Sequence, residues 1–334
     1  MTTAEPPGAL QAFARHGGDL SAARRLFPEA PQPWIDLSTG VNPHPYLLPE
    51  LSPEAWTRLP DRAALARLEA VAASRYRARA EVVAAPGSQA LIQTLARLLP
   101  ARRVCVLGST YQGHARAWSA EVFRVDRIER LAAFDVAVVV NPNNPDGRIV
   151  PAATLRELAE RMAPGTLIVD EAFADFDAAE ESLAPALPER GAIVLRSFGK
   201  AYGLAGLRLG FAILPPGLAA PLRAALGPWA VSGPAIEVGL RALPDEVWLE
   251  AMGARLKGEA ARLDRLLVAT GWSVIGGTKL FRLAAKADAR ERFEALLRSG
   301  ILTRPFANAR DRLRFGLPAD EAAWERLARG LGGA

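Results

Sequence analysis

The sequence predicts an α/β fold in which a mostly parallel central sheet is flanked by helices, together with a smaller α+β domain. Short β-branched runs alternate with helical segments between residues 82 and 214, and this alternation is typical of a parallel sheet with helices on both faces. Pro215-Pro216-Gly217 then breaks the pattern. The length of 334 residues also favours a second domain, because single cores stop growing at roughly 250–300 residues.

The strands are predicted from short apolar runs that are too brief for helices. Buried parallel strands are expected at residues 104–107, 136–140, 166–169 and 192–195, with an added strand at 209–214. Helices are expected at residues 63–76 and 155–162, where Leu65, Leu68 and Val71 fall on one face of the first. An apolar helix is also expected after Gly87-Ser88-Gln89.

Three segments are expected from these elements. Residues 1–45 are rich in Pro and Gly and form an N-terminal arm and part of the small domain. Residues 46–230 form the large domain. Residues 231–334 complete the small domain, with a helix at 260–268 and short strands at 272–275, 280–283, 301–302 and 313–315.

The composition excludes several classes of protein. Half of the residues are hydrophobic and 23% are charged, as in ordinary globular domains. The net charge of +5 does not predict nucleic-acid binding, because arginines are spread along the chain among acidic residues, as on solvated helix faces. No run reaches the roughly 18 apolar residues of a membrane helix, and residues 1–12 lack the apolar region of a signal peptide. We therefore expect a cytoplasmic protein.

Cysteine and histidine give no sign of a metal site. Cys105 is the one cysteine, and its valine neighbours predict a buried strand residue. His16, His44 and His114 lie far apart without ligand-like spacing. We expect no bound metal.

Polar groups follow several predicted strands, at the edge where open α/β sheets bind ligands. Gly87-Ser88-Gln89 lies between a strand and a helix, so its backbone N–H groups could hold a phosphate at the helix N-terminus. An ordinary N-cap is the alternative. The turn at residues 141–147, which contains Asn144, follows the strand at 136–140, and its two prolines also explain it as a rigid turn.

Asp170 and Lys200 follow the next two strands. A carboxylate buried at the end of a strand requires a cationic partner, and an ordinary salt bridge to an arginine would satisfy Asp170 equally well. Lysine occurs only at Lys200, Lys257, Lys279 and Lys286. Lys200 lies in an apolar segment, where desolvation lowers the pKa of an amine and makes it a better nucleophile toward an aldehyde.

Taken in order, these segments resemble fold-type I enzymes of the class I/II aminotransferase superfamily, which use pyridoxal 5′-phosphate (PLP). The resemblance implies that Lys200 forms the Schiff base, that Asp170 pairs with the pyridine nitrogen and that Asn144 bonds the ring 3-oxygen. It assigns the cofactor phosphate to Ser88, Gln89, Ser197 and Arg208. Tyr111 resembles the aromatic residue that covers the ring, although it could be an ordinary loop tyrosine.

Near the C-terminus, Arg314 in Leu313-Arg314-Phe315-Gly316 resembles the family's arginine for a substrate carboxylate, a role that suits a bidentate guanidinium. Arg304 is a second candidate anion contact. Either arginine could instead be a surface residue. The family also implies a homodimer.

Two positions depart from the standard aminotransferase pattern. Phe173 stands where the family usually has a tyrosine, and Leu59 precedes Pro60-Asp61 where histidinol-phosphate aminotransferases carry one. By contrast, His16-Gly17-Gly18-Asp19, the segment 34–43 and the segment 227–233 resemble threonine-phosphate decarboxylases of cobalamin biosynthesis. That resemblance implies a carboxy-lyase rather than an aminotransferase.

The implied reaction is decarboxylation of L-threonine O-3-phosphate to (R)-1-amino-2-propanol O-2-phosphate. His16, Gly17, Asn42 and Arg304 are expected to hold the substrate phosphate, and Arg314 the carboxylate. The alternative is a histidinol-phosphate-type aminotransferase with the same cofactor residues. A basic nucleic-acid-binding protein would leave the order of Asn144, Asp170 and Lys200 unexplained, and no nucleic-acid or membrane partner is expected.

Overall fold

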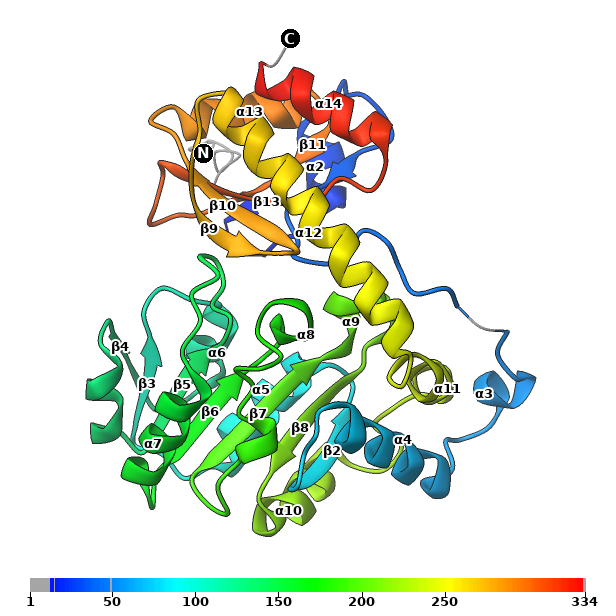
Figure 1. The fold of residues 1–334 in the computed structure, drawn as a ribbon, viewed down its shortest axis with the longest axis vertical. Helices are drawn as coiled ribbons and strands as arrows, with labels where there is room; N and C mark the ends of the chain where they lie inside the picture. The colour runs from blue at the N-terminus through cyan, green and yellow to red at the C-terminus, as the bar shows by residue number, and fades with distance from the viewer. Residues whose placement is uncertain (1–12, 15, 49, 333–334) are drawn as a thin grey trace, which may run out of the picture. The chain divides into compact units, whose positions relative to one another are not determined.

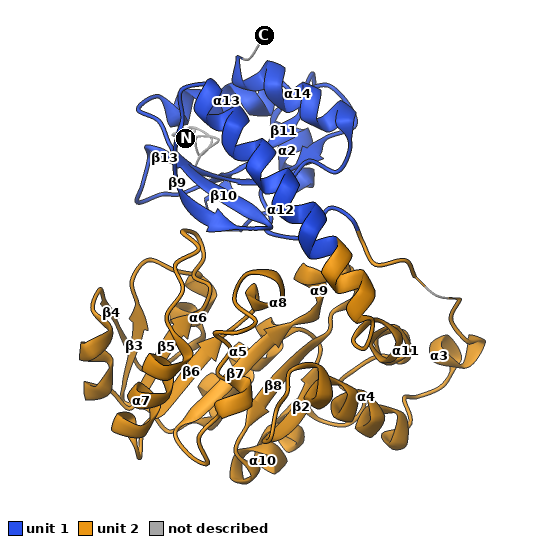
Figure 2. Cartoon of the chain, in the orientation of Figure 1, with its two compact units in different colours: residues 1–44, 252–334 blue, residues 45–251 orange. Residues whose placement is uncertain are grey.

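A computed structural model describes residues 13–14, 16–48 and 50–332. The predicted absence of a signal peptide concerns residues 1–12, which lie outside this range. The chain divides into two compact units: unit 1 comprises residues 1–44 and 252–334, and unit 2 comprises residues 45–251 (Figure 2). Each unit is described by itself.

Unit 2 is built on a seven-stranded sheet with the strand order β2-β8-β7-β6-β5-β3-β4 (Figure 1). The strands are β2 (Glu81–Ala85), β3 (Arg103–Leu107), β4 (Glu121–Val125), β5 (Val136–Val140), β6 (Thr166–Asp170), β7 (Ala192–Ser197) and β8 (Gly210–Leu214). β3 to β7 are mutually parallel, and β8 runs antiparallel to both β7 and β2. The predicted strands are confirmed, and β4 is an addition that the sequence analysis did not anticipate.

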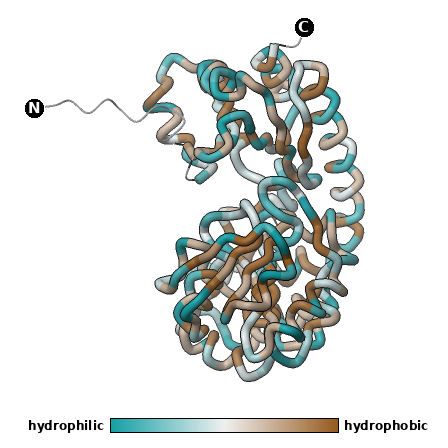
Figure 3. Tube along the Cα trace, turned by 90° about the vertical axis from the view of Figure 1, so that its left-hand side faces the viewer, coloured by the Kyte–Doolittle hydropathy of each residue, from teal (hydrophilic) through white to brown (hydrophobic). Residues whose placement is uncertain are grey.

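The helices of unit 2 cover both faces of this sheet. They are α3 (Pro53–Thr57), α4 (Arg62–Arg75), α5 (Ser88–Leu98), α6 (Gln112–Ala117), α7 (Ala152–Met162), α8 (Ala174–Asp177), α9 (Phe198–Ala201), α10 (Pro216–Leu226) and α11 (Gly233–Ala242), with short 3-10 turns η1 (Ile128–Ala133), η2 (Ala184–Ala186) and η3 (Ala205–Leu207). α4, α7 and α11 pack on one face, and α5 and α10 on the other. Figure 3 shows hydrophobic segments, in brown, running through the middle of the unit.

Because side chains alternate along a strand, the two faces receive different residues at the strand ends. Ile168 and Leu195 lie in the core under α5, which places Asp170 and Ser197 on that same face. Val169 and Val194 lie in the core under α4 and α7, which places Glu171 and Arg196 on the opposite face.

Unit 1 is assembled from the N-terminal segment and the C-terminal part. A four-stranded antiparallel sheet has the order β12-β13-β10-β9, formed by β9 (Ser273–Thr278), β10 (Phe281–Ala285), β12 (Arg304–Pro305) and β13 (Arg312–Gly316). A parallel pair joins β1 (Ile35–Asp36) to β11 (Ile301–Leu302). The helices are α2 (Leu20–Leu26), α13 (Ala289–Arg298) and α14 (Glu321–Leu331), and α12 (Glu246–Ala269) belongs partly to each unit.

The boundary expected near residue 230 differs from the observed one at 251/252. Residues 231–242 remain in unit 2 because Val231, Ala235, Ile236 and Val238 are buried in its core. The N-terminal arm is also more regular than expected, since α2 and β1 lie within it. No described helix is both long enough and apolar enough to cross a membrane.

Candidate cofactor and anion-binding sites

Six strands of unit 2, β2 to β7, run in one direction and end at one edge of the sheet, and β8, which runs the other way, begins there. The predicted cofactor residues follow these strand ends. Ser88 and Gln89 come after β2, Tyr111 after β3, Asn144 after β5, and Lys200 after β7, while Asp170 and Ser197 are the last residues of their strands and Arg208 precedes β8. The topology therefore brings all eight predicted residues of unit 2 to the same edge.

The start of α5 is shaped for an anion. Gly87 is the N-cap, with a φ of 86°, and a Cβ atom there would lie 2.7 Å from an Nη of Arg208. The guanidinium thus lies against the turn at which α5 begins, near the N–H groups of the helix N-terminus. Gly210 allows equally close packing, since its Cβ would lie 2.6 Å from the backbone nitrogen of Ser88. A helix N-terminus with an adjacent arginine suits a phosphate.

Asp170 is a buried carboxylate with a histidine partner. Nε2 of His114 lies 2.8 Å from Oδ2 of Asp170, and both side chains are almost fully buried. The backbone N–H of Ala172 donates to Oδ1 at 3.1 Å. Burial by itself raises the pKa of Asp170, but the hydrogen bond and charge of His114 and the charge of Lys200 outweigh it, and the pKa is lowered. The carboxylate is therefore ready to pair with a cationic ring nitrogen.

His114 was missed by the sequence analysis, which found no ligand-like spacing among the histidines. Its position three residues after Tyr111 could have indicated this contact, because one turn of α6 (Gln112–Ala117) brings the His114 side chain back toward the strand ends. The alternative of an arginine partner for Asp170 is not what the structure has. Arg196 instead pairs at 2.9 Å with Glu171, the residue that follows Asp170, on the opposite face of the sheet.

Lys200 lies in the short helix α9, three residues after the end of β7. Its Nζ is 3.4 Å from Oγ of Ser197 and 5.0 Å from the centre of the Phe173 ring. Phe173 is buried, so an apolar ring covers the amine where the usual family pattern has a tyrosine. Gly199 permits this tight helix, since a Cβ there would lie 2.7 Å from Cα of Ala205.

Tyr111 and Gln89 contact each other. The hydroxyl of Tyr111 donates to Oε1 of Gln89 at 2.8 Å, and the tyrosine ring lies against Gly113, where any Cβ would clash with it. Asn144 occupies the turn after β5. Its neighbour Asn143 fixes that turn by donating to the carbonyl of Ser109 at 3.1 Å and to the carboxylate of Asp146 at 2.8 Å.

The predicted substrate residues all lie in unit 1. Arg304 and Arg314 are directly opposite each other on β12 and β13. Arg304 donates to the carbonyls of Phe13 and Ala14 at 2.6 and 2.9 Å, and Arg314 donates to the carbonyl of Ser38 at 2.7 Å. Burial, followed by the positive charge of Arg304, lowers the pKa of Arg314 to about 9.

The glycine-rich segment packs against Ser38, whose carbonyl accepts from Arg314. The backbone N–H of Gly18 donates to Oγ of Ser38 at 2.7 Å, and a Cβ on Gly17 would lie 2.5 Å from the carbonyl oxygen of Ser38. Asn42 is buried and accepts from the backbone N–H of His44, whereas His16 is exposed. Two cross-strand arginines repel each other, and an anionic group would relieve that repulsion.

These residues fit PLP. An anion-binding helix terminus, a buried charged carboxylate and a lysine amine next to an apolar ring meet the needs of its phosphate, its ring nitrogen and its aldehyde. No group of three or more His, Cys, Asp or Glu residues among the described positions could hold a metal ion.

Comparisons with known proteins agree with this geometry. Residues 32–331 match the family model for aminotransferase class I and II. The chain is 43% identical over 320 residues to a threonine-phosphate decarboxylase of Pseudomonas aeruginosa, covering 93% of this chain and 95% of that one. A threonine-phosphate decarboxylase of Sinorhizobium sp is 41% identical over 324 residues, with coverage of 95% and 97%.

A solved structure gives the fold independently. Histidinol-phosphate aminotransferase from Sinorhizobium meliloti, in complex with pyridoxal-5′-phosphate, superposes with a TM-score of 0.78 at 19% identity, covering 99% of this chain and 97% of that one. The predicted fold-type I architecture is confirmed. The chain belongs to the aminotransferase class I and II family.

Proposed function

We propose that this protein is a PLP-dependent carboxy-lyase that converts L-threonine O-3-phosphate to (R)-1-amino-2-propanol O-2-phosphate, a step of cobalamin biosynthesis. The observation that carries the proposal is the assembly of Lys200, Asp170 and the Ser88–Arg208 anion site at one edge of the sheet. Similarity to two threonine-phosphate decarboxylases over nearly the whole chain supports this substrate over histidinol phosphate.

In this proposal the cofactor residues divide into five tasks. Lys200 would hold the cofactor at its aldehyde carbon. Asp170, kept ionised by His114, would pair with the protonated ring nitrogen. Ser88, Gln89, Ser197 and Arg208 bind the phosphate, Asn144 bonds the ring 3-oxygen and Tyr111 covers the ring. When bound, the cofactor supplies an electron sink for the pair left on Cα.

The chemical step breaks the bond between Cα and the carboxyl carbon. CO2 leaves, the electron pair of the broken bond remains on the Cα side, and Cα then gains a proton, for which Lys200 is the candidate acid. Arg314 binds the carboxylate, and Arg304, with His16, Gly17 and Asn42, binds the substrate phosphate. An anion at this arginine pair would favour the charged form of Arg314, whose pKa is lowered to about 9 by burial and by the charge of Arg304.

We also propose that the enzyme is a cytoplasmic homodimer. Leu47, Trp56 and Leu59 are 86%, 69% and 68% exposed within one short segment of unit 2. Trp229, in the turn before α11, is 56% exposed, and α11 contacts α3 through Gly233 and Ala55. Large exposed apolar side chains concentrated in this way mark protein–protein interfaces, and a second copy is the partner that the family favours.

The test is to mix the PLP-loaded enzyme with L-threonine O-phosphate, without a keto acid, and to follow CO2 and the cofactor spectrum. Sustained CO2 release with an unchanged cofactor band supports a decarboxylase. Lys200→Ala should abolish release, while Lys257→Ala, at an exposed position of α12, should not. Conversion of the cofactor to pyridoxamine phosphate without CO2 would instead establish an aminotransferase.

A further inference from the structure

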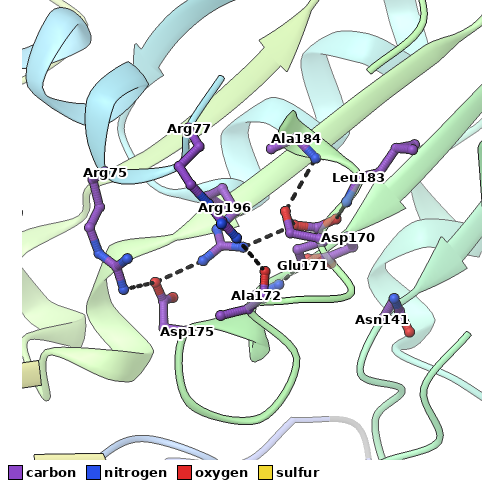
Figure 4. A network of polar contacts seen from close by, with 12 residues as sticks. Arg75, Arg77, Asn141, Asp170, Glu171, Ala172, Asp175, Leu183, Ala184 and Arg196 are labelled. Carbon is purple, nitrogen blue, oxygen red and sulfur yellow. Dashed lines mark hydrogen bonds and ion pairs between the residues drawn. The ribbon is translucent and has the colours of Figure 1, made fainter. Parts of the chain in front are cut away.

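Two arginines and two carboxylates lie on the opposite face of the sheet from Asp170 and Ser197, the last residues of β6 and β7. Arg196 donates from one Nη to Glu171 at 2.9 Å and from the other to Asp175 at 2.7 Å. Arg75 approaches the same Asp175 oxygen at 3.5 Å. Figure 4 shows Arg196 between the two carboxylates, with Arg75 beyond Asp175. We call Arg75, Glu171, Asp175 and Arg196 the buried ion network.

The network is almost free of solvent. The side chains of Arg196, Glu171 and Asp175 are 3%, 0% and 2% exposed, and that of Arg75 is 19% exposed. Glu171 also accepts from the hydroxyl of Ser182 at 2.6 Å and from the backbone N–H of Leu183 at 2.7 Å. Well-packed apolar residues usually stabilise a core as well as such a network does, since desolvating each ion costs several kcal/mol. Global stability therefore does not explain the network.

Its position in the chain does suggest a role. Glu171 directly follows Asp170, and Arg196 directly precedes Ser197. The paired backbone of β6 and β7 ends at Asp170 and Leu195, with one further hydrogen bond from the Glu171 N–H to the Leu195 carbonyl at 2.9 Å. The Glu171–Arg196 ion pair thus ties the two strands together where their backbone ladder stops.

The Glu171–Arg196 ion pair lies on the face of the sheet opposite to the face that carries Asp170 and Ser197. Because neighbouring side chains of a strand point in opposite directions, Asp170 and Ser197 face one way while Glu171 and Arg196 face the other. Any change in the Glu171–Arg196 spacing shifts the Asp170 carboxylate relative to Ser197 and to Lys200 in the next helical turn. A displacement of about 1 Å in such a site is enough to cost a hundredfold in rate.

We propose that the buried ion network is a positioning device that fixes the distance between the Asp170 carboxylate and the Lys200 amine. Its members are positioning residues, because they lie behind the strand ends rather than among the cofactor residues. This inference rests on the proposed cofactor site, but not on the identity of the substrate. Asp175 and Arg75 complete the device by neutralising and orienting Arg196.

Arg196→Met tests the proposal against a matched control. Arg223→Met makes the same change at an arginine of α10 that also pairs with two carboxylates, Glu69 at 2.9 Å and Glu81 at 3.2 Å. Glu81 is the first residue of β2, so this arginine lies at the end of the strand opposite to the cofactor edge. The apo-proteins are titrated with pyridoxal phosphate, and the dissociation constant, the visible circular dichroism of the bound cofactor and the pH dependence of its absorption band are measured.

Arg196→Met is expected to weaken pyridoxal phosphate binding at least tenfold and to change both the dichroism and the absorption pH profile. Arg223→Met should leave all three within twofold of the wild type. Arg196→Lys keeps the positive charge but loses one of the two ion-pair contacts. Compared with Arg196→Met, it should restore part of the affinity and of the pH profile. Leu158→Ala, in the core on the same face, controls for a loss of stability alone.

If Arg196→Met does not fold, Glu171→Gln decides, because it removes one charge and keeps the hydrogen-bonding shape. Wild-type affinity, dichroism and pH profile in a folded Arg196→Met or Glu171→Gln protein would overturn the inference. The same holds if Leu158→Ala alters the cofactor signals equally. A wild-type protein that binds no pyridoxal phosphate would overturn the proposed function instead.

Discussion

Replacing His114 with phenylalanine should weaken cofactor binding through Asp170. The substitution removes the 2.8 Å contact to the buried carboxylate and leaves the Ala172 N–H at 3.1 Å. A hydrogen bond to a charged group contributes about 1.5–3 kcal/mol. Since about 1.4 kcal/mol corresponds to a factor of ten, the dissociation constant of pyridoxal phosphate should rise about 10- to 150-fold.

The pH dependence has a defined sign. The folded-state pKa of Asp170 is lowered, so its ionisation contributes stability above the ordinary carboxyl pKa of about 3.9, and that stability is lost as the pH falls through the folded value. Without His114, burial dominates and the folded pKa rises. The acid midpoint of unfolding, followed by circular dichroism, should therefore move to higher pH in His114→Phe.

His44→Phe is the matched control for both measurements. His44 forms the same kind of contact, with Nε2 2.8 Å from a Glu259 oxygen, within unit 1. It should leave pyridoxal phosphate affinity unchanged. Wild-type affinity together with an unshifted acid midpoint in His114→Phe would refute the reasoning, because Asp170 would then hold its charge without the histidine.

Three further predictions follow from particular positions. Gly87→Ala should weaken pyridoxal phosphate binding about tenfold, because the φ of 86° at Gly87 and the 2.7 Å approach of Arg208 both oppose a Cβ atom there. Gly258→Ala, in α12 with open space around it, should leave the affinity unchanged. Equal affinities of the two variants would contradict the role of Gly87. The affinity for inorganic phosphate, measured by calorimetry, should fall as the pH rises through about 9, where Arg314 loses its charge. An affinity that stays constant up to pH 10 would exclude Arg314 from anion binding. Trp56→Glu should convert a dimer to a monomer in a sedimentation experiment. Val247→Glu, at a position that is 81% exposed, should leave the dimer intact. If Trp56→Glu also remains a dimer, Trp56 does not lie in the interface.

The predictions from sequence were most successful for features that depend only on residues close together in the chain. The strands at 136–140 and 192–195 were predicted because buried parallel strands are continuous apolar runs, and the polar residues that follow them were predicted because parallel strands end at one edge. β4 was missed because it is an edge strand whose residues are at best half-buried, so its apolar run is interrupted by charge.

Contacts between distant segments could not be predicted from local patterns. His114 and Asp170 meet only because β3 and β6 lie on either side of β5. The pairing of Arg304 with Arg314 depends on the register of two short strands. The extension of unit 2 to residue 251 could not be predicted for a similar reason, because the burial of residues 231–242 depends on α4, a helix far earlier in the chain.

The composition of unit 1 from both ends of the sequence has a consequence for folding. Unit 2 is one continuous stretch, so its contacts can form while later residues are still being synthesised, as is usual for domains. β1 cannot pair with β11 until Ile301 has been made, and pairings between such distant residues form slowly. We expect the cofactor-binding unit to fold first and to persist transiently while the strands bearing Arg304 and Arg314 remain unformed.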